Sequence, residues 1–400
     1  MKKLLFILIA LPFILNAQSI YKFDLQIRPR FEIDNKDFNS STNPNTFTAL
    51  RSRLGLSLKA SDDVSAYVQL QDSRIFGEEA STLSNSKNLD VHQIFFKINN
   101  LFDLPVDVKV GRMELKYGSE RFLGPVGWHN VGRSFDGGVL TFKSCLFNAD
   151  LIAAREYERF NPADSLDQNI YALMGDLFIF KKYKIQPFVI WQRVNPTNYL
   201  DRATLGFYIS GNLKNLKHEI DFGYQTGSAL INGREQDVSA MTFSFNANYT
   251  FSHSLKPFIG IQYDYASGDN NPLDNDYKAY VSLYPTGHKF FGYMDYFINL
   301  NNDAYNLGIS DIVLKCGIAP VKDLNVSLNY HIFRSVEEYV YTGGSSYDFG
   351  TEADLTVKYN YNEYVDIQAG ASLFAPGAIF KKMRGEDTSS WFYLMTTVNL

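Results

Sequence analysis

Residues 241–251 read Met-Thr-Phe-Ser-Phe-Asn-Ala-Asn-Tyr-Thr-Phe, an unbroken alternation of apolar and polar side chains. Successive side chains of a β-strand point to opposite faces, so this stretch predicts a strand with one apolar and one polar face. The same pattern continues in both directions and is clearest at 324–332, 353–361, 365–373 and 392–400. Because no segment after the first residues shows a convincing helical period, we expect an all-β protein.

The number of these segments and the rhythm of their connections indicate a closed barrel. Short connections alternate with long ones from end to end of the chain. Outer-membrane barrels have an even number of antiparallel strands, short periplasmic turns and long extracellular loops. The sequence therefore predicts a transmembrane antiparallel β-barrel of about 18 strands, near 20–33, 47–60, 63–76, 89–99, 106–117, 137–143, 147–156, 169–181, 184–194, 202–213, 216–227, 239–251, 255–266, 306–319, 323–335, 350–361, 363–374 and 389–400.

Composition separates a membrane barrel from a soluble β-sandwich, whose strands also alternate. The chain has 26 Tyr and 32 Phe among 400 residues, more than a soluble core requires. Membrane barrels place such rings in girdles at both lipid interfaces. A formal net charge of −5 gives no reason to expect a nucleic-acid partner. The two cysteines, Cys145 and Cys316, are too few for a disulfide framework and lack metal-ligand spacing.

The first 17 residues have the features of a secretory signal. Lys2 and Lys3 precede an apolar run from Leu4 to Leu15, and the small residue Ala17 lies at the expected cleavage point. We therefore expect residues 1–17 to be a signal peptide and residues 18–400 to form the barrel, in the outer membrane of a Gram-negative-type bacterium. Its expected partners are outer-membrane lipid, periplasmic chaperones and the barrel-assembly machinery, and the sequence does not define an oligomeric state.

Alternation also assigns side chains to the lumen or to the lipid. Phe23, Leu25 and Ile27 are assigned to lipid, so the polar positions between and beyond them face inward. An arginine that faces lipid at mid-depth costs about 2–4 kcal/mol, which favours the same assignment. The residues predicted to line the pore and to select solutes are Arg28, Arg30, Arg51, Arg53, Lys97, Lys109 and Arg202.

The position of Arg112 does not follow this rule, because it shares the parity of the lipid-facing Val110. A β-bulge at Gly111 would turn the arginine inward. A place beyond the apolar band would instead leave it outward without a large cost. The sequence leaves both explanations open.

The lumenal arginines have two interpretations. A guanidinium group binds a carboxylate at two points, and a ring of positive side chains selects anions. The arginines would then pass carboxylate-bearing solutes from one to the next. Alternatively, they pair with acids of a facing wall and stiffen the lumen. The acids assigned to that wall are Glu352, Asp354 and Asp366, which barrel closure brings toward the first strands.

Several stretches of sequence resemble a known family. Residues 111–124 read Gly-Arg-Met-Glu-Leu-Lys-Tyr-Gly-Ser-Glu-Arg-Phe-Leu-Gly. They are followed by Trp128-His-Asn130 and Arg133-Ser-Phe-Asp-Gly137, and later by Tyr284-Pro-Thr-Gly-His-Lys-Phe-Phe-Gly-Tyr-Met-Asp295. With the stretches at 52–54 and 71–74, they resemble the alginate-export family of outer-membrane porins over nearly the whole mature chain. The residues that match the family motifs are Gly111, Arg112, Tyr117, Gly118, Arg121, Gly124, Trp128, His129, Arg133, Asp136, His288, Lys289, Gly292 and Asp295.

The resemblance implies the barrel fold and an arginine-rich pore through which an anionic polysaccharide is exported. This chain is shorter than the founding type of the family, so its loops are expected to be trimmed. We predict a channel for passive passage of small or oligomeric anionic solutes, such as uronate-like sugars or an anionic polysaccharide. The segment 267–305, which is long enough to fold inward, is the predicted gate.

Two other classes of protein are alternatives to a channel. A structural barrel with a plugged lumen is the first alternative, and a barrel hydrolase is the second. No Gly-x-Ser-x-Gly motif supports a hydrolase, so no catalytic residue and no enzyme activity are expected. No metal or other cofactor is expected either. The Asp- and Asn-rich stretch 269–276 offers oxygen ligands for calcium but lacks EF-hand spacing, and a solvated loop is the favoured interpretation.

Overall fold

The computed structural model describes residues 20–84, 88–157, 167–179, 182–194, 199–231 and 233–400. The predicted signal peptide, 1–17, lies outside the described residues, as do parts of the predicted loops 77–88, 157–168 and 195–201. Within the described ranges, no helix is both long enough and apolar enough to cross a membrane.

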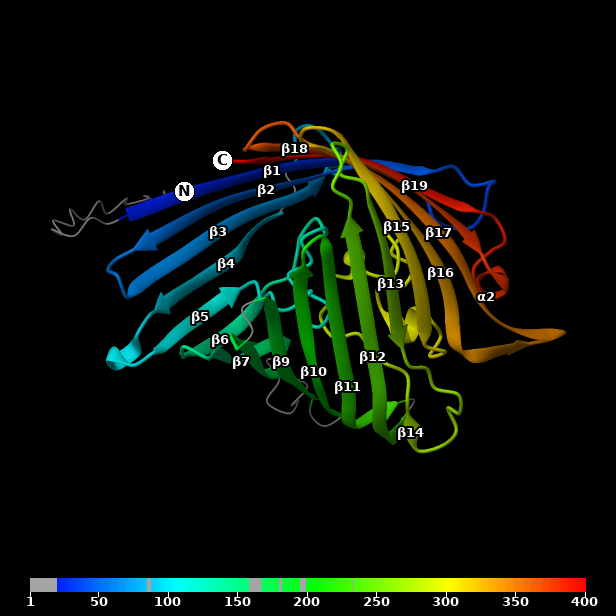
Figure 1. The fold of residues 1–400 in the computed structure, drawn as a ribbon, viewed down its shortest axis with the longest axis horizontal. Coiled ribbons are helices and arrows are strands. Elements are labelled where there is room, and N and C mark those ends of the chain that lie inside the picture. Colours follow the sequence, from blue (N-terminus) through cyan, green and yellow to red (C-terminus); the bar gives the residue numbers. More distant parts are fainter. Residues whose placement is uncertain (1–19, 85–87, 158–166, 180–181, 195–198, 232) are drawn as a thin grey trace.

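Nearly all of the regular structure is β-strand (Figure 1). The strands of the wall are β1 (Ile20–Asn35), β2 (Asn45–Lys59), β3 (Val64–Ile75), β4 (Leu89–Ile98), β5 (Val106–Met113), β6 (Phe135–Lys143), β7 (Phe147–Tyr157), β8 (Gln168–Leu177), β9 (Tyr183–Val194), β10 (Leu200–Leu213), β11 (Leu216–Ile231), β12 (Arg234–Thr250), β13 (Phe258–Ala266), β15 (Ile309–Val321), β16 (Leu324–Tyr341), β17 (Gly344–Asn360), β18 (Val365–Pro376) and β19 (Ser389–Asn399).

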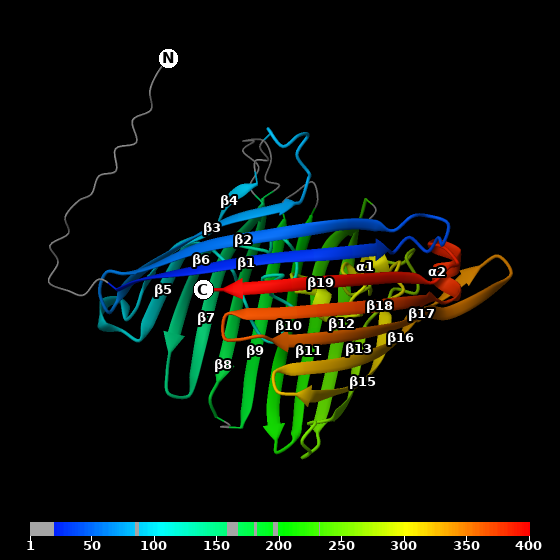
Figure 2. The same cartoon turned by 90° about the horizontal axis from the view of Figure 1, so that it is seen from above.

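These strands form one closed antiparallel barrel. Each pairs with its neighbour in the chain, β13 pairs directly with β15, and β19 pairs with β1 to close the sheet. At this seam, β1 lies between β2 and β19 (Figure 2). The sheet has 19 strands in all, and the remaining one, β14 (Asp276–Tyr277), is a two-residue strand parallel to β12. Without β14, the wall has the predicted 18 strands, and the predicted fold class is confirmed.

Two predicted loops are strand instead. The segments assigned to loops 228–238 and 336–349 continue the hairpins β11–β12 and β16–β17, which end in very short turns. The prediction failed there because these ends do not show a regular alternation of apolar and polar residues. The hydrogen-bonded ladder continues where the hydrophobic alternation has stopped.

Burial follows the predicted parity. On β2, Arg51 and Arg53 are only 4% and 8% exposed, whereas Leu54 and Leu58 are 48% and 45% exposed. Exposed outward rings near the short-turn end include Tyr21, Phe23, Phe142, Phe147, Tyr249, Phe251, Tyr359 and Tyr361. Tyr171, Tyr224 and Phe392 are outward rings farther along their strands. The outer surface therefore carries an apolar band with aromatic residues at its edges.

The hydrophobic core lies inside the barrel. Two long loops, 114–134 and 267–308, fold into the lumen together with the short helices α1 (Leu300–Asp303) and α2 (Ala378–Met383). Single 3-10 turns are η1 (Leu101–Asp103) and η2 (Gly287–Lys289). The ring of Phe380 in α2 packs against Phe297 and Phe374 at centroid distances of 5.3 and 5.4 Å. Inward wall residues and the two loops thus bury one another.

An outward charge should destabilise the barrel in proportion to its depth. Leu355 on β17 is 43% exposed on the apolar band and lies four residues farther from the short-turn end than the outward ring of Tyr359. Leu355→Arg is expected to lower the free energy of unfolding in lipid vesicles by about 2–4 kcal/mol. Tyr361→Arg, at the edge of the band, is the matched control and should cost about 0–1 kcal/mol. Equal losses at the two positions would contradict the assigned band.

Candidate functional site

The first lumen loop, residues 114–134, starts where the short strand β5 ends. Its residues Tyr117 to Glu120 form a turn, in which Glu120 N donates to Tyr117 O at 2.9 Å and Gly118 has a φ of 60°. That left-handed conformation favours glycine. The Tyr117 hydroxyl donates to Asp150 Oδ2 at 2.7 Å, and Gly118 N donates to Gln186 Oε1 at 3.1 Å. These bonds fix the start of the loop to β7 and β9.

Four predicted pore arginines hold the rest of this loop. All four are buried on the inward face of β1 and β2 and donate to loop carbonyl groups. The contacts are Arg28 Nη1 to Gly127 O (2.6 Å), Arg28 Nη2 to Trp128 O (2.9 Å), Arg30 Nη1 to Trp128 O (2.6 Å), Arg51 Nη1 to Gly127 O (3.0 Å) and His129 O (3.1 Å), and Arg53 Nη2 to Val131 O (3.1 Å). We call Arg28, Arg30, Arg51 and Arg53 the arginine cluster.

The arginine cluster is only partly neutralised. Arg30 pairs with Glu32 at 2.7 Å, and Arg53 pairs with Glu114 at 3.1 Å. Within the described ranges, no carboxylate lies within 4 Å of Arg28 or Arg51. Burial and the nearby guanidinium groups lower the pKa of the loop residue His129 below its usual value. This wall of the lumen is therefore a region of positive potential.

The second lumen loop, residues 267–308, pairs with the first. Gly124 N donates to Tyr284 O at 2.8 Å, Tyr284 N to Phe122 O at 3.0 Å, and Thr286 N to Glu120 O at 2.9 Å. Leu123 and Tyr284 form an isolated parallel bridge. The predicted inward folding of 267–305 thus takes place, but the constriction is made by two loops rather than one.

An acidic wall on later strands holds the second loop. Met294 N donates to Glu352 Oε1 at 2.9 Å, and Tyr293 N donates to Asp354 Oδ2 at 3.4 Å. Gly292 precedes them with a φ of 85°, and a Cβ at this position would lie 2.6 Å from Glu352 Oε2. Glycine is therefore required for the carboxylate to reach these amide groups.

Arg121 joins the first loop to acidic residues of the same wall. Its Nη2 donates to Asp264 Oδ1 at 2.8 Å and to Ser244 Oγ at 3.0 Å, and its Nε lies 3.7 Å from Asp221 Oδ2. Buried charges are stable only when paired and hydrogen bonded. This arginine therefore fixes the tip of the first loop against β11, β12 and β13.

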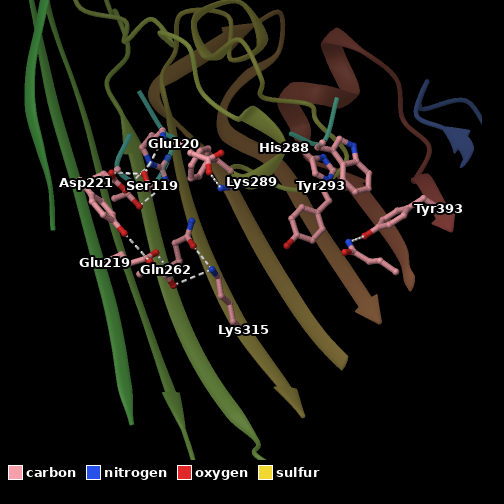
Figure 3. A pocket seen from close by; sticks show the side chains of 18 residues that line it. Ser119, Glu120, Glu219, Asp221, Gln262, His288, Lys289, Tyr293, Lys315 and Tyr393 are labelled. Carbon is pink, nitrogen blue, oxygen red and sulfur yellow. Dashed lines mark hydrogen bonds and ion pairs between the residues drawn. The ribbon is translucent and has the colours of Figure 1, made fainter. Parts of the chain in front are cut away.

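A cavity of about 460 Å³ lies under the two loops (Figure 3). Glu219, Gln262 and Lys315 line its wall from β11, β13 and β15. The other side is aromatic: the His288 ring stacks on Trp128 at a centroid distance of 4.1 Å and on Tyr293 at 5.1 Å. The cavity combines charged, amide and aromatic groups.

A second cavity, of about 630 Å³, opens along the inner face of β1–β4. Three lysines line it, Lys22, Lys59 and Lys97, together with Asp62 and other residues near the short turns. Lys59 pairs with Asp62 at 2.6 Å, and Lys97 pairs with Asp107 at 3.1 Å. The cationic side chains continue the positive wall of the arginine cluster toward the short-turn end. We call these three residues the mouth lysines.

Most of the predicted site residues lie on the lumen side. Lys109 faces inward with its Nζ 4.0 Å from the Phe95 ring centroid, and the buried Arg202 donates to Gln192. Of the motif residues, Gly124 pairs the two loops, Arg133 donates to Gly124 O and Pro285 O, and Asp295 accepts from His288 at 2.9 Å. Their roles in solute passage remain predictions.

Several expectations need correction. No register shift interrupts β5, so Gly111 forms no bulge and Arg112 stays outward, where it pairs with Asp136 at 2.9 Å. Within the described ranges, the arginine cluster makes no ion pair with Glu352, Asp354 or Asp366. Those acids instead contact loop amides, His331 and Lys358. The prediction missed Lys22 and Lys315. Lys22 has the same parity as the inward Arg28, and Lys315 directly follows the outward Leu314, so alternation assigns both lysines to the lumen.

The arrangement is that of a channel protein. Among the residues that the structure describes, no group of three His, Cys, Asp or Glu side chains is placed to hold a metal ion. A closed barrel with an apolar outer band, polar inner walls and inward-folded loops defines the class of outer-membrane porins.

The particular family follows from the sequence. The alginate export family model matches residues 20–393, and the chain belongs to that family. The comparison with curated proteins gives no match. Solved structures share the fold. Pseudomonas aeruginosa OprD has 12% identity, 95% coverage of this chain and 94% of its own, and a TM-score of 0.63. P. aeruginosa OccK11 (OpdR) has 13% identity, 95% and 96% coverage, and a TM-score of 0.61.

The ion pair between the two loops should respond to acid. Glu120 is buried, which raises its pKa, but hydrogen bonds from Lys289 and Thr286 and the Lys289 charge outweigh burial and hold the pKa below its usual value. Its Oε1 lies 2.7 Å from Lys289 Nζ. A carboxylate with a lowered pKa stabilises the folded loops above the usual glutamate pKa, and this stabilisation is lost as pH falls through the lowered value.

Hydrogen exchange can measure this effect. Near pH 7, Glu120→Gln is expected to lower the protection of the amides at 117–124 and 284–290 by about tenfold, because a buried charged hydrogen bond contributes about 1.5–3 kcal/mol before compensation. The difference from the unmodified protein should shrink in acid. Lys278→Gln serves as the control, because the ion pairs of Lys278 join it to Asp274 and Asp276 within the second loop. Protection unchanged by Glu120→Gln at neutral pH would contradict the ion-pair role.

Proposed function

We propose that this porin lets small or oligomeric anionic solutes, such as uronate-like sugars or an anionic polysaccharide, pass the outer membrane by passive diffusion. One observation carries the proposal: Arg28 and Arg51 lie on the lumen wall with no carboxylate within 4 Å among the described residues. Charges that are excluded from water and unpaired attract counter-ions strongly. Because the first loop covers both side chains, an anion would be attracted to this wall through the positive potential in the lumen.

The mouth lysines extend the attraction along a path. They lie at the short-turn end, which is the periplasmic end in an outer-membrane barrel. From there, inward positions of β1 and β2 lead from Lys22 and Lys59 to Arg28 and Arg51. Arginine residues bind carboxylates in two-point geometry, and successive weak sites allow an ion to enter and to leave.

A structural relative supports the same chemistry. P. aeruginosa OpdK, which has 10% identity and a TM-score of 0.62, was crystallised with vanillate, a carboxylate. OpdK covers 95% of this chain, and 98% of its own length is matched. A carboxylate-bearing ligand is therefore compatible with a barrel of this shape, and the arginine cluster and mouth lysines provide the charges for it here.

A plugged structural barrel is the second candidate function. The observation that favours it is the hydrogen-bonded contact between the two lumen loops, which lie above the cavity of about 460 Å³. Liposome swelling with neutral sugars separates the two functions, because only an open channel admits sugars and the water that follows them. Swelling no faster than that of protein-free liposomes would favour the plugged barrel.

Several accompanying assignments belong to the same proposal. Residues 1–17 act as a signal peptide, and 18–400 form the barrel in the outer membrane after delivery by periplasmic chaperones and insertion by the barrel-assembly machinery. The protein acts as a channel and not as a hydrolase. An assay of the purified protein for ester and peptide hydrolysis is therefore expected to give only background rates.

Ion selectivity tests the central claim. A charge about 8 Å from an ion path contributes about 0.5–2 kcal/mol at an effective dielectric constant of about 20–80. Reversing two mouth lysines, in Lys22→Glu with Lys59→Glu, should lower the anion-to-cation permeability ratio by about tenfold. Reversal potentials in planar bilayers under a salt gradient measure this ratio.

The control variant has the same net charge as the test variant, but its two substituted residues lie away from the path. Lys214→Glu with Lys322→Glu changes two lysines of short turns that line neither cavity, and Lys322 has a side chain that is 92% exposed. The control is expected to keep the ratio of the unmodified channel. A cation-selective channel whose reversal potential is the same in all three proteins would remove the anion hypothesis.

A further inference from the structure

A row of charged side chains crosses the outer surface of three strands. Arg112 on β5 is opposite Asp136 on β6, which is opposite Arg155 on β7. Arg112 and Asp136 form an ion pair at 2.9 Å, and Arg155 pairs with Asp167 at 2.9 Å. All three have outward parity, because their inward neighbours Met113, Phe135 and Ala154 are buried. We call Arg112, Asp136 and Arg155 the outer charged row.

The outer charged row lies within the height of the apolar band. Arg112 is six residues from Val106, the first residue of β5, and Asp136 is six residues from the exposed ring of Phe142. At about 3.3 Å per residue and a tilt of about 40°, six residues rise about 15 Å. The apolar band of a membrane barrel is about 25 Å tall. A lone barrel would therefore hold these charges against hydrocarbon.

Short strands alone do not explain the charges. β13 has 9 residues, as β6 does, and each of the two strands adjoins a loop that folds into the lumen. Its outward residues are nevertheless apolar or aromatic to the end: Ile259, Ile261, Tyr263 and Tyr265. The outward face of β5–β7 thus carries charges where the outward face of the equally short β13 is apolar or aromatic.

The surface below the outer charged row is made partly of small residues. Gly138 on β6 and Ala153 on β7 are opposite each other and face outward, and Ala149 faces outward on the other side of the Leu140–Leu151 pair. The nearest atoms to a Cβ built on Gly138 lie 3.7 Å away, so the surface there is open. In a membrane, proteins associate through small residues that permit close approach and through polar contacts, because lipid removes the hydrophobic driving force.

We propose that the outward face of β5–β7 is a lateral contact with a second copy of this chain. The outer charged row has the signs plus, minus, plus, and Asp167, the partner of Arg155 directly before β8, adds a minus after them, so a two-fold rotation about an axis between β6 and β7 brings opposite signs together. A two-fold axis normal to the membrane between β6 and β7 places Asp136 of one copy opposite Arg155 of the other. The charges are then covered by protein instead of lipid, and the small residues let the two walls approach.

The inference does not depend on the solute that the channel carries. It commits to a second copy because the alternating charges fit one another better than they fit an anionic lipid headgroup, which Asp136 would repel. A barrel that stays single would leave the row in contact with lipid, and that outcome would overturn the proposal.

The test measures the mass of the full-length protein in mild detergent and in lipid nanodiscs by light scattering and native mass spectrometry. The unmodified protein is expected to have a mass that is a multiple of the chain mass. Ala153→Trp should place an indole in the contact and give monomers. Ala371→Trp, at an outward alanine of β18, is the matched control and should leave the mass unchanged.

A charge exchange separates a specific contact from a folding defect. Asp136→Arg makes the outer charged row wholly positive and should give monomers, whereas Asp136→Arg with Arg155→Asp again places opposite charges against each other across the two-fold axis and should restore the oligomer. Circular dichroism and single-channel conductance show whether each variant is folded. The proposal is overturned if the unmodified protein is a monomer at every concentration or if Ala153→Trp keeps the oligomer.

Discussion

The interior of this barrel depends on the hydrogen-bonding needs of the two loops inside it. Each loop brings backbone N–H and C=O groups into a space where water is limited, and such groups are costly when they lack partners. The two walls of the lumen supply opposite kinds of partner. The arginine cluster donates to the carbonyl groups of Gly127, Trp128 and His129, and the acids Glu352 and Asp354 accept from the amides of Met294 and Tyr293. Charge on the walls is therefore part of the fold as well as part of the channel.

The same distribution divides the lumen into a positive side and a negative side. Arg28 and Arg51 have no acidic partner among the described residues, while Asp221, Asp264 and Asp311 are buried on β11, β13 and β15, where Arg121 and His331 pair with them. A solute that passes under the loops experiences a field across its path, in addition to any attraction along it. Aromatic groups such as His288 and Tyr293 lie at one side of this path and offer flat surfaces to a ring.

Strand parity could be predicted from the sequence because it depends on neighbours two residues apart. Arg51 and Arg53 were assigned to the lumen by the leucines that follow them, and the structure agrees. The contacts of those arginines could not be predicted in this way. Arg28 meets carbonyl groups about 100 positions later in the chain, and a period of two carries no information about such distances. Arg112 shows the reverse case: parity placed it outward, and only the register of β4, β5 and β6 could show that no bulge changes this.

The seam between β1 and β19 has a consequence for the time course of folding. Leu25 and Leu400 exchange two backbone hydrogen bonds, of 3.0 and 2.9 Å, and the Gln26–Asn399 side-chain contact nearby spans 373 positions of sequence. Contacts between such distant residues form slowly, because the entropy of closing a long chain is lost before the contact stabilises it. Every other wall pairing joins strands that are near neighbours in sequence. Closure is thus expected to be the late and slow event, and until then the growing sheet exposes two unpaired edges to other chains.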